Sequence, residues 1–251
     1  MTSESASVVQ PEPKGMGEFS RVTGVFFEPG VAFADIAARP RWVVPVLLII
    51  LGIIAFNVTY GSHVGWHTLV MDQLDTPKAA ERMQNMTAEQ RQQAIAMQEK
   101  MMPFIYTIGP VLMPLAFVIS AGLMMGMLAT MSSGLRFKQV FAITCYAGLV
   151  GIIANILGIV VMFLKSPDQF NFMNPLAFNP AAFMDPKSSS KFLYTLGTGL
   201  DLFKIWGAVL TAIGIKVAAG NRISATGAAL VVFVPYAVLL LIGATLAGMF
   251  S

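Results

Sequence analysis

The chain has 251 residues and a formal charge of +3 from 16 basic and 13 acidic side chains. Hydrophobic residues make up 56% of it and charged residues only 12%, well below the roughly 25% usual in soluble domains. The basic residues stand singly beside apolar runs instead of forming a stripe, which argues against a nucleic-acid partner. We therefore expect an integral membrane protein whose main partner is the lipid bilayer.

The N-terminal part divides into a tail and an amphipathic segment. Residues 1–15 are small and polar without apolar periodicity, so a disordered tail is predicted. From Phe19 apolar residues recur at helical spacing until Pro29, and a second short run of the same kind follows. Two arrangements fit this pattern: two helices lying in the membrane interface, or a turn packed on the bundle. The first long apolar run begins near Trp42, too late for a cleaved signal peptide.

Five largely uncharged segments are long enough to cross a hydrocarbon core about 30 Å thick, which takes about 20 helical residues. They are too long for barrel strands, and a helix pairs its own backbone groups, so each is predicted to be a helix. The sequence predicts an all-α polytopic membrane protein, a bundle of about five transmembrane helices forming one membrane domain over residues 16–251. The predicted spans are residues 42–60, 104–131, 139–164, 192–219 and 225–250.

Basic residues flank the spans unevenly and predict the orientation. Acid-free pairs occupy two short connectors, and two arginines precede the first span: Arg136 and Lys138, Lys216 and Arg222, Arg39 and Arg41. Because such residues favour the cytoplasmic side, we expect a cytoplasmic N-terminus and an outer C-terminus. The expected location is the bacterial inner membrane.

The predicted outer loop over residues 61–103 should be helical. Thr76 followed by proline has the form of an N-cap and first helical position, and Thr87 followed three residues later by glutamine has the form of a capping box. These signals predict short helices over residues 77–85 and 88–101.

The second predicted outer loop, residues 165–191, combines four prolines and Asn-Pro turns with aromatic residues. Its aromatic side chains are candidates for the interfacial belt that flanks a bilayer. They are Phe170, Phe172, Phe178 and Phe183.

The fourth span contains an acid and a base. Only about eleven apolar residues separate Lys204 from Lys216, too few to cross the core, so the predicted helix carries Asp201 and Lys204 into the membrane. At 1.5 Å per residue Asp201 lies about 22 Å and Lys204 about 18 Å from the cytoplasmic end, on one face at i, i+3 spacing. We expect them to pair with each other. Three roles fit the two residues: a structural pair, part of a proton or ion path, or an element that a partner recognises.

His63 and His67 form a weak metal motif at the outer end of the first span. Their i, i+4 spacing puts both rings on one face if the helix continues through Gly61 and Gly65, and Asp72 could be a third ligand. Two histidines without a defined third ligand favour an unmetallated interfacial pair. We predict no metal and no cofactor.

Small residues recur at four-residue spacing in two spans, as Gly122 with Gly126 and Ala244 with Gly248. This spacing permits close approach of two helices. Packing within the chain explains both pairs, and a possible homodimer is the alternative.

Catalytic signatures are missing from the sequence: it has no zinc-protease HExxH, no G-x-S-x-G and no phosphate-binding P-loop. Both histidines lie at an outer edge, which leaves no recognisable nucleophile or metal set inside the bundle. We predict that the protein is not an enzyme.

Spaced aromatics, prolines and one acid resemble those of bacterial Yip-domain proteins, which are similar to the eukaryotic Ypt/Rab-interacting membrane proteins. The resemblance runs from about residue 20 to the C-terminal part and implies a five-helix bundle with a cytoplasmic N-terminus. In the fourth span, Asp201, Phe203 and Trp206 match the family's Asp-x-Phe-x-x-Trp pattern, so Asp201 and Trp206 are family-typical positions without assigned chemistry. The other matching residues are Val25–Pro29, Ala32, Phe33, Ile36, Arg39, Pro40, Trp42–Pro45, Phe137–Tyr146 and Gly214.

Two functions fit these observations. The leading hypothesis is a non-enzymatic membrane protein that organises or assists a partner membrane protein. The alternative is a small transporter or channel that uses Asp201 and Lys204. Transport predicts that polar groups of several spans line one shared cavity, and the candidates are Asn57, Asn155, Asp201 and Lys204.

Overall fold

The computed structural model describes residues 15–75, 77–186 and 188–249. Within these ranges the chain forms twelve α-helices and four short 3-10 turns, with no strand, which confirms the all-α prediction. Five helical segments are long and apolar enough to cross a membrane. The predicted tail lies almost wholly outside the described residues, and so does the predicted N-cap Thr76.

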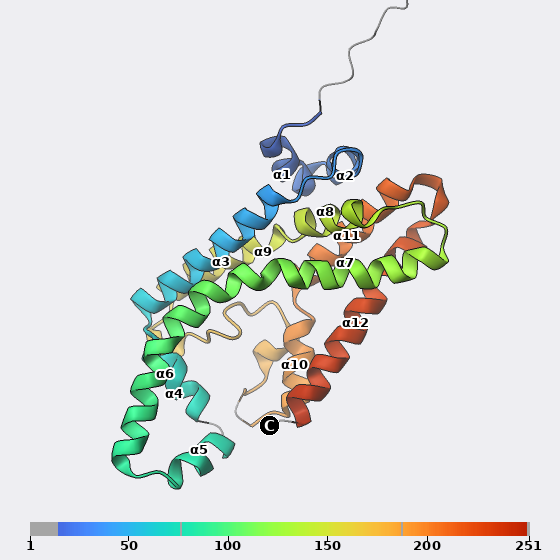
Figure 1. The fold of residues 1–251 in the computed structure, drawn as a ribbon. Coiled ribbons are helices and arrows are strands. Elements are labelled where there is room, and N and C mark those ends of the chain that lie inside the picture. Colours follow the sequence, from blue (N-terminus) through green and yellow to red (C-terminus); the bar gives the residue numbers. More distant parts are fainter. Residues whose placement is uncertain (1–14, 76, 187, 250–251) are drawn as a thin grey trace, which may run out of the picture.

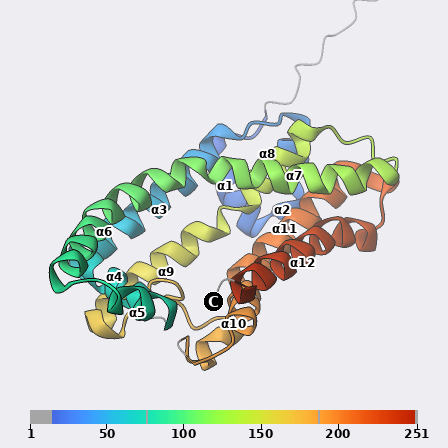
Figure 2. The same cartoon turned by 60° about the horizontal axis from the view of Figure 1, so that its bottom comes forward.

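The five membrane-crossing segments are joined by shorter helices (Figures 1 and 2). The crossing segments are α3 (Val43–His63), α6 to α7 (Ala88–Ile108 and Met113–Thr130, joined by a 3-10 turn), α8 to α9 (Phe137–Ala147 and Val150–Leu164), α11 (Leu202–Ala219, extended by a 3-10 turn) and α12 (Ala225–Met249). The shorter helices are α1 (Glu18–Phe27), α2 (Pro29–Ala38), α4 (Trp66–Leu74), α5 (Pro77–Gln84) and α10 (Lys191–Gly199).

The α1–α2 hairpin consists of two short helices, as one of the two arrangements requires, and it packs on one end of the bundle, as the other requires. Phe33 and Ile36 of α2 are fully buried in a cluster that includes residues of α8 and α11. Phe19 and Phe27 point away and are more than 80% exposed, so the hairpin also keeps an apolar outer surface.

A buried arginine fastens this hairpin. Arg21 is 1% exposed, and its guanidinium lies 2.7 Å from the Asp35 carboxylate and 3.5 Å from Glu18. The hydroxyl of Tyr146, in α8, donates a hydrogen bond to Glu18, and Arg39 pairs with the other oxygen of Asp35. The network therefore links α1, α2 and α8 around the buried guanidinium of Arg21.

The two basic connectors and the N-terminal hairpin lie at the same end of the bundle (Figure 1). Arg222 donates to the Ser133 carbonyl oxygen over 3.4 Å, which joins the connectors that follow α7 and α11. Gln139, at the start of α8, donates to the carbonyl oxygen of Ala37 over 3.0 Å. Helices α4, α5 and α10 lie at the opposite end (Figure 1).

The second membrane-crossing segment is formed by α6 and α7, which a 3-10 turn joins. The predicted helix start and capping box are present, since Thr87 and Gln90 exchange side-chain and backbone hydrogen bonds at 2.9 and 3.2 Å. The predicted end near residue 101 is wrong, because the helix continues through Pro103 and the whole segment Ala88–Thr130 counts 43 residues. Its first half projects beyond the bundle together with α4 and α5 (Figure 1).

The two small-residue pairs behave differently. Ala244 is fully buried and Gly248 approaches Phe192 of α10, so this pair packs within the chain as predicted. Gly122 and Gly126 are exposed, and a Cβ atom added to either would meet nothing within 4 Å. Packing within the chain therefore does not explain the pair in α7.

The carboxyl of Asp35 has a lowered pKa. Burial alone would raise the pKa, but hydrogen bonds from Arg21, the Met16 N–H and Arg39 outweigh it and hold the pKa below 3.8. A carboxyl with a lowered folded-state pKa stabilises the fold above its unfolded value of about 3.9, and this contribution is lost as pH falls through the folded-state pKa.

We predict that Asp35→Asn destabilises the protein at neutral pH by about 3 kcal/mol, because it leaves the buried charge of Arg21 without its partner. Arg39→Gln is the control and should change stability by less than about 1 kcal/mol, because Arg39 is 46% exposed. Thermal unfolding in mild detergent measures both. The difference between wild type and Asp35→Asn should shrink below about pH 4; equal loss in both variants would contradict the role of the buried pair.

Candidate functional site

The predicted fourth span, residues 192–219, is not one continuous helix. Helix α10 ends at Gly199, Leu200 leaves the helical conformation, and α11 begins at Leu202 after Asp201 in extended conformation. The physical reason is local, because Gly197 and Gly199 weaken the helix and Asp201 favours an N-cap. The interrupted helix corrects the prediction of a single span.

The break lies beside the middle of α12. Phe192 lies against Gly248 and Gly199 against Leu240, so α10 runs antiparallel to the last part of α12. The hydroxyl of Tyr236 donates to the Gly199 carbonyl oxygen. At 1.5 Å per residue, Tyr236 and Leu240 lie about 17 and 23 Å along a helix about 37 Å long. The interruption therefore lies near the centre of the bundle.

The two charges pair with the free ends of the half-helices and not with each other. Asp201 accepts hydrogen bonds from the backbone N–H groups of Phe203 and Lys204 at 2.9 and 3.4 Å. The Lys204 ammonium donates to the carbonyl oxygen of Thr198, in the last turn of α10, over 3.0 Å. The predicted ion pair between Asp201 and Lys204 is wrong. An acid at a helix N-terminus and a base at a helix C-terminus also complement both helix dipoles.

The second predicted outer loop folds back onto this break. The Leu202 N–H donates to the Phe178 carbonyl oxygen over 3.1 Å, and the Asn179 amide approaches the Asp201 carboxylate at 3.4 Å. The Phe178 ring packs edge-on against Phe203 with centroids 5.7 Å apart. The loop thus supplies further hydrogen bonds to backbone and side-chain groups at the interruption.

The other loop aromatics are only partly placed as expected. Phe170 and Phe172 join an aromatic cluster with Tyr60 of α3 and Trp66 of α4, with Phe170 3% exposed. Phe183 is 89% exposed and alone among the four points fully outward.

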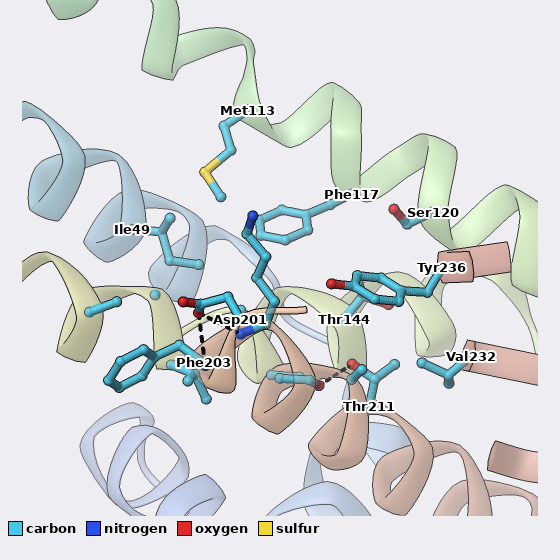
Figure 3. A pocket seen from close by; sticks show the side chains of 18 of the residues that line it. Ile49, Met113, Phe117, Ser120, Thr144, Asp201, Phe203, Thr211, Val232 and Tyr236 are labelled. Atoms are coloured by element: carbon cyan, nitrogen blue, oxygen red, sulfur yellow. Dashed lines mark hydrogen bonds between the residues drawn. The ribbon is translucent and has the colours of Figure 1, made fainter. Parts of the chain in front are cut away.

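A cavity of about 460 Å³ lies beside the helix break (Figure 3). Residues of α3, α7, α8, α9, α11 and α12 line it, and most of the lining is apolar. Figure 3 shows Phe117 of α7 and Tyr236 of α12 converging on the space near Asp201. The polar lining includes Ser120, Thr144, Asn155, Asp201, Lys204 and Tyr236.

Three of the four polar candidates from the sequence share this cavity, namely Asn155, Asp201 and Lys204. Asn57 lies elsewhere, where its amide donates to the Tyr106 carbonyl oxygen over 2.5 Å. Sequence reasoning missed Ser120, Thr144 and Tyr236, since single hydroxyl groups in apolar spans give no pattern. The break itself had a signal, because an acid after Gly-x-Gly and before an apolar run is typical of an N-cap.

Trp206 and the two histidines lie away from the cavity lining. Trp206 packs edge-on against Phe26 of α1, with centroids 5.9 Å apart. The histidines do not share a helix face, because α3 ends at His63 and Gly65 has a φ of +93°. The His63 ring lies 4.4 Å from the ring of Phe163, whereas His67 contacts Glu99. The described residues include no group of three or more potential metal ligands.

A family model for the Yip1 domain matches residues 23–247. The chain belongs to the Yip1 domain family. No significant match was found among curated proteins or among solved structures. With five apolar helices, this Yip1-domain chain is an integral membrane protein.

The Asp-x-Phe-x-x-Trp pattern of this Yip1-domain chain has a structural explanation. Asp201 caps α11, Phe203 holds the returning loop through Phe178, and Trp206 holds the N-terminal hairpin through Phe26. One helical turn therefore fastens two separate segments of the chain to the bundle.

We predict that Asp201→Ala destabilises the protein by about 1 kcal/mol, whereas Asp201→Asn has a smaller effect because its side-chain oxygen can still accept from the Phe203 N–H. Thermal unfolding in mild detergent compares them, with the exposed Asp168→Ala as a control. Equal losses in the asparagine and alanine variants would show that the charge, and not the cap, stabilises the break.

Proposed function

We propose that this protein is a non-enzymatic carrier that binds a small amphipathic solute in the cavity at the helix break and moves it through the bilayer. The main support for this proposal is that residues from six helices line one space beside a discontinuous helix. Asn155, Asp201 and Lys204 are among these residues. In this proposal the α1–α2 hairpin and both basic connectors face the cytoplasm of a bacterial inner membrane.

The size and composition of the cavity support this function. A volume of about 460 Å³ falls in the range of about 300–1,000 Å³ found for small-molecule sites, which are mostly apolar with a few polar groups. Many transporters place their substrate near the bilayer midplane, between half-helices whose free ends carry partial charges. Because three donors already hold the Asp201 carboxylate, a proton relay through this acid is the weaker alternative.

The break also offers a place where the structure can bend. Across the break, hydrogen bonds run from Lys204 to the Thr198 carbonyl oxygen and from Tyr236 to that of Gly199, while α10 packs along α12. An exchange of these partners would let α10 rotate against α11 without unwinding either helix. Hinge movements of this kind occur at the ends of secondary-structure elements.

A cavity-filling variant tests the carrier function. Gly151 lines the cavity and a Cβ atom there would meet nothing within 4 Å, so Gly151→Leu should fill the space without a clash. Gly243→Leu is the matched control, because Gly243 is equally unobstructed but exposed on α12 and absent from the lining.

The assay uses proteoliposomes and radiolabelled single-chain probes with sulfonate, trimethylammonium or glucoside head groups. Extraction with cyclodextrin removes the outer-leaflet probe and so measures its transfer inward. We expect wild type and Gly243→Leu to accelerate at least one probe and Gly151→Leu to return it to the protein-free rate. The carrier function is excluded if wild type accelerates none of the three.

The projecting arm of α4, α5 and the first half of α6 favours a second function, the organisation of a partner membrane protein. Four methionines on it are between 37% and 67% exposed, although they lie outside the most apolar parts of the spans. Exposed methionines are common on adaptable protein-binding surfaces. These residues are Met71, Met86, Met97 and Met101.

We predict that the double variant Met97→Ser and Met101→Ser loses a partner protein that wild type retains after purification in mild detergent. Gln93→Ser is the control, because Gln93 is exposed one turn before Met97 on the same helix face. Quantitative mass spectrometry of the purified samples measures the partner. Identical partner profiles in all three samples would argue against the arm as a docking surface.

A further inference from the structure

The free hydrogen-bonding groups of the cavity are mainly donors. The Lys204 ammonium has three N–H groups and a single described acceptor, the Thr198 carbonyl oxygen. The Asn155 amide and the Ser120 hydroxyl also line the cavity and have no hydrogen-bond partner among the described residues. All three can donate to a ligand that brings acceptor atoms.

The acidic and basic charges at the break are not equally satisfied. The Asp201 carboxylate accepts from two backbone N–H groups and from Asn179, and it sits at the positive end of the α11 dipole. Lys204 has only one carbonyl partner, so two of its donors remain available. The unmatched charge that faces the cavity is therefore positive.

The rest of the lining requires an apolar partner. Apolar side chains from α3, α7 and α12 form much of the remaining lining, among them Ile53, Met113, Phe117, Met124 and Leu239. An alkyl chain gains about 25 cal/mol for each Å² of apolar surface that such side chains remove from water. The volume, at the lower end of the range for ligand sites, suits one chain and a small head group.

We propose that the cavity binds an amphiphile with an anionic head group and an alkyl chain. The anionic oxygens accept hydrogen bonds from Lys204, Asn155 and Ser120, and the chain lies along Met113 and Phe117 of α7. This inference rests on the carrier function and specifies its ligand class. A cationic head group would find only one carboxylate, and three donors already occupy that group.

Binding of the single-chain sulfonate probe to the protein in nanodiscs tests the ligand class. We expect wild type to bind the sulfonate probe more tightly than the trimethylammonium and glucoside probes. Lys204→Gln should weaken sulfonate binding about tenfold or more while leaving glucoside binding unchanged, because a hydrogen bond to a charged group contributes at least that much. Thermal unfolding of Lys204→Gln in mild detergent checks that the variant keeps the fold without the Lys204 bond to the Thr198 carbonyl oxygen.

Lys204→Arg and Asp201→Asn complete the test. The arginine variant keeps the positive charge and should retain the sulfonate preference, whereas Asp201→Asn should strengthen sulfonate binding because it removes a nearby negative charge. Unchanged sulfonate binding in Lys204→Gln, or tighter binding of the trimethylammonium probe, would overturn the inference. Transfer of a probe without any head-group preference would overturn it while leaving the carrier function standing.

Competition identifies the source of the anionic group. A single-chain alkyl phosphate and the two-chain phosphatidylglycerol are each added against the sulfonate probe, with phosphatidylcholine as the zwitterionic control. Displacement by the alkyl phosphate alone indicates a single-chain solute, and displacement by phosphatidylglycerol as well indicates a membrane lipid. Displacement by phosphatidylcholine as strong as by both anionic compounds would contradict an anionic head group.

Discussion

A bilayer interior offers no water to a backbone group that has lost its helical partner, and this constraint governs the centre of the molecule. The chain leaves the helical conformation between α10 and α11, which frees carbonyl groups at the end of α10 and N–H groups at the start of α11. The Asp201 carboxylate accepts from the freed N–H groups, and it is also bonded by the Asn179 amide. Lys204 and Tyr236 donate to the freed carbonyl oxygens. These hydrogen bonds pair the backbone groups that the interruption frees, and residues at the interruption form part of the cavity wall.

The same turn of α11 connects the centre to both ends of the molecule. Phe203 holds the loop that returns from the end of the bundle where α4 and α5 lie, and Trp206 holds the hairpin at the other end. The hairpin is also tied to α8 through the buried network of Arg21 and Asp35. Residues in the first turn of α11 therefore contact segments that extend to both ends of the bundle.

Hydropathy and length were enough to predict the helical class and the five crossing segments, because the bilayer requirement acts on long stretches of sequence. Capping signals also located the start of α6, where Thr87 is bonded as predicted. The break was missed because hydropathy averages over Gly197 to Asp201, and the pairing of Asp201 with Lys204 was inferred from an unbroken helix. Ser120 and Tyr236 could not be predicted, since only the tertiary arrangement brings isolated hydroxyl groups from α7 and α12 to one space.

The segment Ala88–Thr130 joins the projecting part of the molecule to the cavity wall. Its 43 residues have a helical contour length of about 64 Å, roughly twice the hydrocarbon thickness, and the segment bends where α6 and α7 meet at a 3-10 turn that contains Pro110 (Figure 1). The α6 half carries the exposed Met97 and Met101, and the α7 half carries Phe117 and Ser120 of the cavity wall. If a partner binds α6, the 3-10 turn Gly109–Leu112 is the covalent connection between the bound half of this segment and the half that lines the cavity.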